Sequence, residues 1–136
     1  MSEEVLHKIA AIAVEDNKLL MVRRVDSKWD LVEVKQGHWL TEERAITNLF
    51  QRIIGCPLRI KSKIGDIEIP ERKPDQIFRL SLFEVVLLGT MFLRDETIVE
   101  WRYVSLDEIK RLDVMDHVIS YVVPLCVKKG ILGWQW

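Results

Sequence analysis

Arginine side chains at two places in the sequence could bind an anionic ligand. Arg23 and Arg24 follow an apolar run, and Arg52 follows Gln51 within a helical pattern. A guanidinium group donates two parallel hydrogen bonds, a geometry that suits phosphate. The alternative is plain solvation, because Arg23 and Arg24 also fit a strand end, and Gln51 and Arg52 also fit an exposed helix face. The sequence leaves both interpretations open.

The most regular part of the chain lacks the carboxylates that a hard metal ion needs. Mg²⁺ is usually held by one or two carboxylates together with phosphate oxygens and water. From Arg44 to Gly65 the sequence has no Asp or Glu, whereas five Lys and Arg residues lie there. A cationic side chain in contact with the ion would repel it by on the order of 1 kcal/mol or more. We therefore expect no Mg²⁺ site on this segment.

Histidine and cysteine show no metal-binding or catalytic pattern. His7, His38 and His117 are scattered, without the spacing of metal ligands, so we expect no metal site. Cys56 and Cys126 lack a C-x-x-C spacing and are expected to be buried thiols in a reducing compartment. The chain also lacks the G-x-S-x-G sequence and a glycine-rich phosphate loop.

A basic strand raises the question of nucleic-acid binding. Arg59, Lys61 and Lys63 alternate with apolar residues and could contact an RNA backbone by releasing its counterions. No aromatic residue alternates with them to stack on bases, and solvated lysines on an edge strand explain the pattern more simply. The formal net charge is only −1. We expect neither nucleic acid nor a membrane as a partner.

A hairpin and a short strand are predicted near the start of the chain. Apolar runs at 9–14 and 19–22 flank Asp16 and Asn17. Asp and Asn tolerate the left-handed backbone that a tight hairpin turn requires. The short strand is expected at 29–34.

The clearest helical pattern follows this strand. Thr41 can cap the helix, and Gly55 followed by Pro57 would end it. Apolar residues recur at helical spacing between these signals, at Ile46, Leu49, Phe50, Ile53 and Ile54.

Strands dominate the expected second half. They begin at Leu58 and cover 77–88 and 97–104, with a polar loop at 70–75. Ser105 and Glu108 have the spacing of a capping box, which predicts a short helix.

A last helix is predicted from a cap at Asp116 to about Lys129, with a kink at Pro124. It is apolar nearly all round, so it must be covered by the rest of the domain or by a second subunit. Trp134 and Trp136 follow it. Because large rings at a chain end are seldom left in water, we expect a homodimer.

The order of these elements resembles the Nudix family over nearly the whole chain. Residues 100–109, EWRYVSLDEI, are similar to the strand and helix start that close Nudix domains, and residues 19–24, LLMVRR, are similar to their second strand. The resemblance implies an α/β (α+β) fold with a mixed β-sheet sandwiched between helices. It also implies hydrolysis of a diphosphate with Mg²⁺ held by the acids of the Nudix box, G-x5-E-x7-R-E-U-x-E-E-x-G-U, where U is apolar.

The box itself departs from the family. With its late glycine placed on Gly55, Asn48 stands at the arginine position and Leu49 at the glutamate that follows it. Arg52 and Ile53 then replace the paired glutamates. The resemblance therefore predicts a degenerate Nudix box that has lost its metal ligands.

Two functions follow from this comparison. The first is a non-hydrolytic module that binds a nucleotide-like ligand or a protein partner and has no cofactor. The alternative is a divergent Mg²⁺-dependent hydrolase of nucleoside-diphosphate-linked substrates that recruits acids from elsewhere, with Glu33, Glu68, Glu84 and Glu100 as candidates. The expected ligand-binding residues are Arg23, Arg24, Glu33, Gln51, Arg52 and Glu100.

Composition limits the organisation of the chain. Its 136 residues are 49% apolar and 30% charged, which predicts one folded domain over 1–136. The acidic start and the lack of an apolar run of about 20 residues predict a cytoplasmic protein without a membrane span.

Overall fold

The computed structural model describes residues 4–35, 41–70 and 76–133. Pro70 ends a strand, and the rest of the predicted loop at 70–75 lies outside the described residues, as do Trp134 and Trp136. The elements are β1 (Glu4–Glu15), β2 (Lys18–Arg24), β3 (Trp29–Asp30), β4 (Val32–Lys35), α1 (Glu42–Ile54), β5 (Leu58–Pro70), β6 (Gln76–Leu87), β7 (Ile98–Val104), α2 (Leu106–Ile109), the π-helical segment η1 (Val118–Val122) and α3 (Val123–Lys128).

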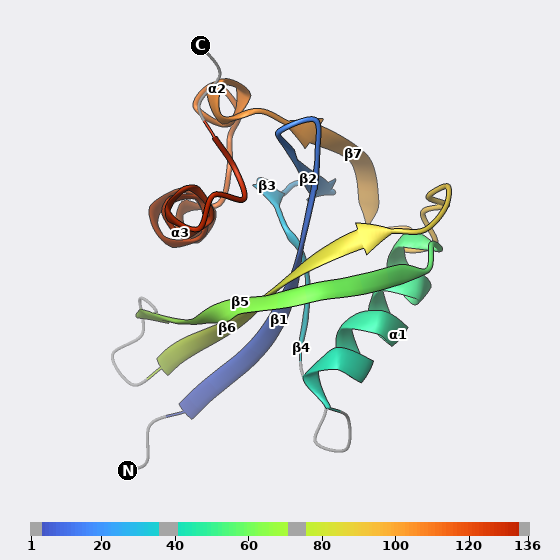
Figure 1. The fold of residues 1–136 in the computed structure, drawn as a ribbon, viewed down its shortest axis with the longest axis horizontal. Coiled ribbons are helices and arrows are strands. Elements are labelled where there is room, and N and C mark those ends of the chain that lie inside the picture. The colour runs from blue at the N-terminus through green and yellow to red at the C-terminus, as the bar shows by residue number, and fades with distance from the viewer. Residues whose placement is uncertain (1–3, 36–40, 71–75, 134–136) are drawn as a thin grey trace.

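Strand β1 is the centre of a mixed β-sheet (Figure 1). It pairs in parallel with β6 and antiparallel with β4 and β2, while β5 extends the sheet beyond β6 and β7 lies beside β2. Strand β2 pairs with β1 only at Val14 and Glu15, whereas β4 pairs with β1 over Lys8–Ala11. As a result β2, β3 and β7 diverge from the other strands.

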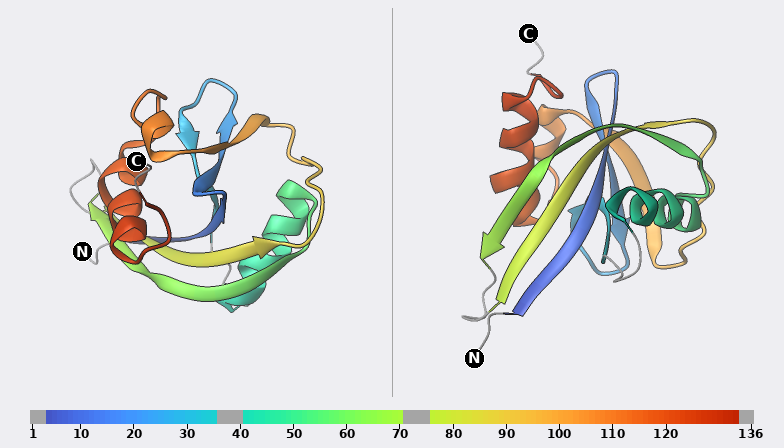
Figure 2. Two further views of the ribbon diagram at one scale, coloured as in Figure 1. Left: turned by 45° about the horizontal axis from the view of Figure 1, so that its top comes forward. Right: turned by 60° about the horizontal axis from the view of Figure 1, so that its bottom comes forward.

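Helices cover both faces of the sheet, and Figure 2 shows α1 and α3 on opposite sides of it. Ile9 and Ala11 of β1 pack in the core beneath α1, while Ala10 and Ile12 pack in the core beneath η1 and α3. This alternation is the period-2 pattern of a strand buried on both faces. The predicted mixed sheet between helices is confirmed.

Local signals in the sequence explain where several elements begin and end. Asp16 and Asn17 have φ angles of 51° and 60° and form the predicted turn between β1 and β2. Thr41 caps α1 by accepting a hydrogen bond from the Arg44 N–H, and Gly55 ends it with φ of 70°. The predicted strand at 29–34 is present as β3 and β4, interrupted at Leu31.

The C-terminal segment differs in part from the prediction. The capping box of Ser105 and Glu108 is present at α2. The predicted cap at Asp116 is wrong, because the N–H groups of Val118 and Ile119 bond to the Met115 carbonyl and, in the described part of the chain, no side chain caps the start of η1. Pro124 lies where the helix changes from π to α, since it has no N–H to continue the π pattern.

The last helical segment buries one face only. Val118, Val122 and Cys126 are fully buried against the sheet, whereas Ile119 is 43% exposed and Tyr121 is 38% exposed. The rest of the domain thus covers one face of this helix and leaves Ile119 and Tyr121 partly in contact with solvent. Among the described residues, none of the helices has the length and apolar character needed to cross a bilayer.

Candidate functional site

A cavity of about 350 Å³ lies against the second half of α1. Its described lining residues are Asn48, Gln51, Arg52 and Arg94, and we call it the α1 cavity. Gln51 and Arg52 lie one turn after Asn48 on the exposed face of α1, away from the buried Ile46 and Phe50. The structure thus brings the predicted Gln51 and Arg52 to one cavity with a second arginine.

The segment after β6 places Arg94 there. The N–H groups of Phe92 and Arg94 donate to the carbonyls of Ile54 and Ile53, at 2.7 and 2.9 Å. Gly55 permits this approach, because a Cβ on it would lie 2.3 Å from the Phe92 carbonyl oxygen. The contact between this segment and the end of α1 fixes the backbone from which Arg94 projects.

The same hydrogen bonds change the electrostatics of the cavity. The C-terminal end of a helix carries partial negative charge on its unpaired carbonyls, which disfavours anions. In α1 the carbonyls of Gln51, Ile53 and Ile54 accept bonds from Gly55, Arg94 and Phe92. These hydrogen bonds reduce the partial negative charge at the end of α1. An anion bound by the two guanidinium groups is therefore repelled less by the helix end.

The family resemblance predicts that Arg52 and Ile53 replace the paired glutamates of the box. Arg52 is exposed in the α1 cavity, and Ile53 packs against the core beneath α1. The two acids of α1, Glu42 and Glu43, lie in its first turn. They are therefore two to three turns away from Arg52 along the helix.

A second cavity of about 230 Å³ lies where β2 diverges from β1 and β4. We call it the strand cavity; its described lining residues are Lys8, Val22, Arg24, Ser27, Lys28, Asp30, Leu31 and Glu33. It brings together Arg24 and Glu33, two of the predicted residues. Neither of them lines the α1 cavity among the described residues.

His117 completes a charged group beside the strand cavity. Its Nε2 lies 3.3 Å from Glu33 Oε2 and 3.4 Å from Asp30 Oδ1. Burial alone would lower the pKa of His117, but hydrogen bonds to the two carboxylates raise it to about 9. Burial raises the pKa of Asp30, and the hydrogen bond to His117 partly offsets this effect. We call these three residues the His117 cluster.

Arg23 and Glu100 bind each other. Arg23 Nε donates to Glu100 Oε1 at 2.6 Å, across the paired strands β2 and β7. Arg24 projects to the other face of β2, where it binds Asp95 Oδ2 at 2.6 Å and the Thr97 hydroxyl. The six predicted residues thus lie at three places, with Arg23 and Glu100 at one, Arg24 and Glu33 at the strand cavity, and Gln51 and Arg52 at the α1 cavity.

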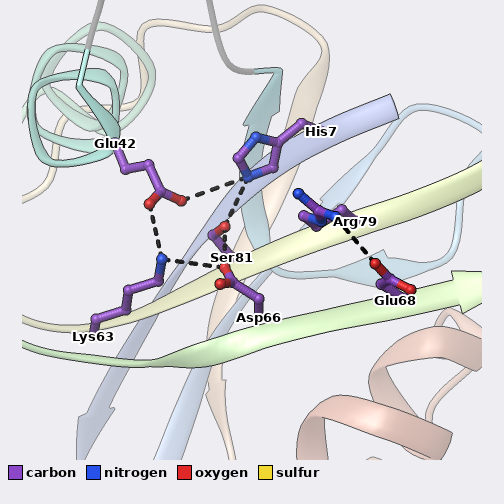
Figure 3. Close-up of polar contacts among 7 residues, drawn as sticks. All are labelled: His7, Glu42, Lys63, Asp66, Glu68, Arg79 and Ser81. Carbon is purple, nitrogen blue, oxygen red and sulfur yellow. Dashed lines mark hydrogen bonds and ion pairs between the residues drawn. The ribbon is translucent and has the colours of Figure 1, made fainter. Parts of the chain in front are cut away.

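A third polar group fixes the first turn of α1 to the sheet (Figure 3). Ser81 is fully buried on β6 and donates to Asp66 Oδ1 at 2.5 Å, so the His7 Nε2, 2.8 Å away, must donate to Ser81. Lys63 lies between Glu42 and Asp66, at 2.8 and 3.2 Å. We call this the His7 network. Lys63 is exposed on the edge strand β5, as expected, and its ammonium group also binds both carboxylates.

The geometry of the His7 network indicates a structural role and not a catalytic one. The buried Ser81 hydroxyl is out of reach of a substrate, and His7 uses the same nitrogen toward both Ser81 and Glu42 Oε2. Burial raises the pKa of Glu42, but the hydrogen bonds to this carboxylate and the positive charge of Lys63 together outweigh burial, so the pKa is lowered. The Glu42 carboxylate therefore stays ionised and holds the start of α1 near β1 and β5.

Comparison with solved structures identifies the fold. A Nudix hydrolase from Nitrosomonas europaea is 14% identical, with a TM-score of 0.81 over 97% of this chain and 98% of that one. A UDP-X diphosphatase is 17% identical, with a TM-score of 0.79 over 98% of this chain and 67% of that one. The Nudix domain of Shewanella oneidensis NrtR, complexed with ADP-ribose, is 8% identical, with a TM-score of 0.72 over 93% of this chain and 89% of that one.

The chain therefore has the Nudix fold, as the order of its elements predicts. No protein-family model matches the sequence, and no curated protein sequence matches it.

Sequence reasoning missed several residues of these groups. Arg94 comes from a segment without helical or strand periodicity, so no pattern marks it. Lys8 and Asp30 belong to strands whose facing partners are distant in sequence. His117 lies 84 positions from Glu33, and no rule of ligand spacing covers such a separation.

Proposed function

We propose that this protein is a Nudix-fold module that binds an anionic, nucleotide-like ligand in the α1 cavity without a metal ion and without hydrolysing it. The observation that carries the proposal is the chemistry of the lining. Two guanidinium groups and two carboxamides face the cavity, and its described lining includes no carboxylate.

Such a lining suits phosphate groups directly. Arg52 and Arg94 can each donate two parallel hydrogen bonds to phosphate oxygens, and the amides of Asn48 and Gln51 can add neutral donors. In a hydrolase of this fold a metal ion would neutralise the diphosphate. Here positively charged side chains can neutralise it, which makes a metal unnecessary for binding.

The candidate acids for the alternative, a divergent hydrolase, do not converge. Each of them forms an ion pair with a different cation, and these pairs are Glu33 with Lys8, Glu68 with Arg79, Glu84 with Lys61, and Glu100 with Arg23. None of the four is among the described residues that line the α1 cavity. This dispersion favours binding over metal-assisted hydrolysis.

A thermal-shift panel in EDTA tests the proposal. ADP-ribose, ADP, a UDP-sugar and inorganic pyrophosphate are suitable probes, because the neighbours in fold are named for UDP-linked and ADP-ribose compounds. A ligand at about 100 times its dissociation constant adds roughly 2.7 kcal/mol of apparent stability. We expect a saturable shift for at least one diphosphate probe. No shift with any of them would contradict the proposal and would turn attention to a protein partner.

An activity assay distinguishes the two functions. We expect no phosphate or nucleotide release from these compounds with Mg²⁺ or Mn²⁺. Turnover that disappears with EDTA would overturn the non-hydrolytic assignment and support the alternative.

We also propose a homodimer in the cytoplasm. The exposed Ile119 and Tyr121 support a second subunit on the outer face of the last helix, and Cys56 and Cys126 are both buried and unpaired, as expected in a reducing compartment. Light scattering after size exclusion, on the chain and on a version that ends at Leu132, tests the dimer. Monomeric profiles for both would contradict it.

A further inference from the structure

We propose that the His117 cluster of Asp30, Glu33 and His117 is a binding site for a divalent transition-metal ion of the zinc type. The proposal is independent of anion binding in the α1 cavity, because different elements and different residues form the two places. It concerns a side-chain group that lies on the opposite face of the sheet from α1.

The distances within the cluster match the coordination geometry of zinc. Imidazole nitrogen and carboxylate oxygen bind Zn²⁺ at about 2.0–2.2 Å, and two ligands at a tetrahedral angle are then about 3.4 Å apart. His117 Nε2 lies 3.3 Å from Glu33 Oε2 and 3.4 Å from Asp30 Oδ1. The three ligand atoms all lie within 4.8 Å of one another. An ion can therefore contact all three without a large movement of the backbone.

The protein holds these ligands in place through its backbone. The Trp29 N–H donates to the Asp113 carbonyl and the Met115 N–H donates to the Trp29 carbonyl, each at 2.9 Å. These bonds fix the segment before His117 beside β3, which carries Asp30. Glu33 follows on β4. A site with its ligands on such connected elements needs little reorganisation to bind an ion.

Burial and ring orientation aim the histidine at the carboxylates. The side chains of His117 and Glu33 are each 10% exposed. The Phe78 ring meets the imidazole edge to face, with the centroids 5.6 Å apart, and so restricts its rotation. His117 Nε2 is directed at both carboxylates, which is the arrangement that a shared cation requires.

The strand cavity gives an ion access to the cluster. Asp30 and Glu33 line this space of about 230 Å³, so water or an anion could take the remaining coordination positions. Of the cations of the cavity, Arg24 and Lys28 have partners outside the cluster, and Lys8 binds the Glu33 oxygen that does not face His117. Lys8 binds the other Glu33 oxygen, Oε1, at 3.4 Å; Arg24 binds Asp95 and Lys28 lies 3.8 Å from Asp113. The ion would replace the proton on His117 Nε2, which leaves to solvent.

The His7 network provides a matched control. His7, Glu42 and Asp66 also present ligand atoms within 4.8 Å of one another. There, however, the Lys63 ammonium lies between the two carboxylates, at 2.8 and 3.2 Å, and fills the position that an ion would take. We therefore expect no transition-metal binding at that network.

Calorimetric titration of Zn²⁺ into the tag-free chain of residues 1–136, stripped with EDTA and then dialysed, tests the proposal. We expect saturable binding of one ion per chain. Glu33→Gln and Asp30→Asn, which change one atom each, should each weaken binding by about tenfold or more. Glu42→Gln should bind as the wild type does. Wild-type affinity in both of the first two variants, or a loss of binding in Glu42→Gln, would overturn the proposal.

A measurement on the wild-type protein avoids any effect of the substitutions on folding. Crystals soaked in zinc and recorded at the zinc absorption edge should show one anomalous peak bonded to His117 Nε2, Asp30 and Glu33. No peak there, or an ion bound only at other surface groups, would overturn the assignment. Neither result bears on ligand binding in the α1 cavity, so the two proposals fail separately.

Discussion

Arg52 and Arg94 carry the charge that the proposed function depends on. A hydrogen bond to a charged group contributes about 1.5–3 kcal/mol, and about 1.4 kcal/mol corresponds to a tenfold change in affinity. We expect Arg52→Ala and Arg94→Ala each to weaken binding of a diphosphate probe by about tenfold or more. Arg44→Ala is the control, because Arg44 is exposed on the same helix but is not among the described lining residues of the α1 cavity.

Calorimetric titration of the three variants checks this prediction. Equal losses in Arg44→Ala and Arg52→Ala would indicate that the general positive charge of the helix, and not the cavity, attracts the ligand.

Arg24 and Asp95 form an ion pair with a predictable pH dependence. Hydrogen bonds from Arg24 first, and from the Thr97 hydroxyl and N–H, lower the pKa of Asp95 from 3.8 to about 2. Because the pKa is lower in the folded state, the stabilisation is complete above about pH 4 and is lost as the pH falls through 2. Both side chains are partly exposed, so we expect a contribution of about 1 kcal/mol.

Urea unfolding of the wild type and of Asp95→Asn measures this contribution. The variant should be less stable by about 1 kcal/mol at pH 7, and the difference should shrink toward zero near pH 2. A difference that stays constant between these pH values would contradict the assignment of the effect to the Asp95 carboxylate.

At the scale of elements, the junction between α1 and the segment after β6 positions Arg94. Gly55 has φ of 70° and a Cβ there would lie 2.3 Å from the Phe92 carbonyl oxygen. We expect Gly55→Ala to destabilise the fold by about 2 kcal/mol or more, since left-handed backbone costs about 1 kcal/mol and the segment must also move. The same movement should displace Arg94 and weaken ligand binding.

Gly130 is a matched control for this substitution. Its φ is 76°, and no described atom lies within 4 Å of a Cβ built on it. Gly130→Ala should therefore cost only the backbone term, about 1 kcal/mol. Denaturant unfolding measures the free energy of unfolding of both variants. Equal losses of stability would show that the contact with Phe92 does not contribute to the effect of Gly55→Ala.

The elements that the sequence predicts best are those with local signals. Thr41 and Gly55 mark the ends of α1 within its own sequence, and Asp16 and Asn17 mark the first turn. The last helix was harder to predict, because its first N–H groups bond to the Met115 carbonyl and Asp116 looks like a cap without acting as one. A cap depends on backbone geometry as well as on residue type.

At the scale of the whole molecule, residues from distant segments meet in ways that no local pattern reveals. Gln51 and Arg52 could be predicted from the exposed face of one helix, but Arg94 joins them only because its segment covers the end of α1. Likewise, His117 is far from Asp30 and Glu33 in the sequence, so no rule of ligand spacing predicts that the three side chains meet. The sequence thus predicts which side chains could bind an anion better than where they meet.

The mixed sheet, with α1 on one face and η1 and α3 on the other, gives the molecule two separate polar places. The α1 cavity presents hydrogen-bond donors and, among its described lining residues, no carboxylate, while the His117 cluster lies across the sheet. The central claim is therefore that the fold is kept while side chains replace the metal in holding a diphosphate.

Calorimetric titration of ADP-ribose into the protein in EDTA, with mass spectrometry of the ligand afterwards, tests this claim most directly. We predict saturable binding in the absence of any metal ion and recovery of the ligand intact. Binding that requires added Mg²⁺ or Mn²⁺, followed by cleavage of the diphosphate, would contradict the account.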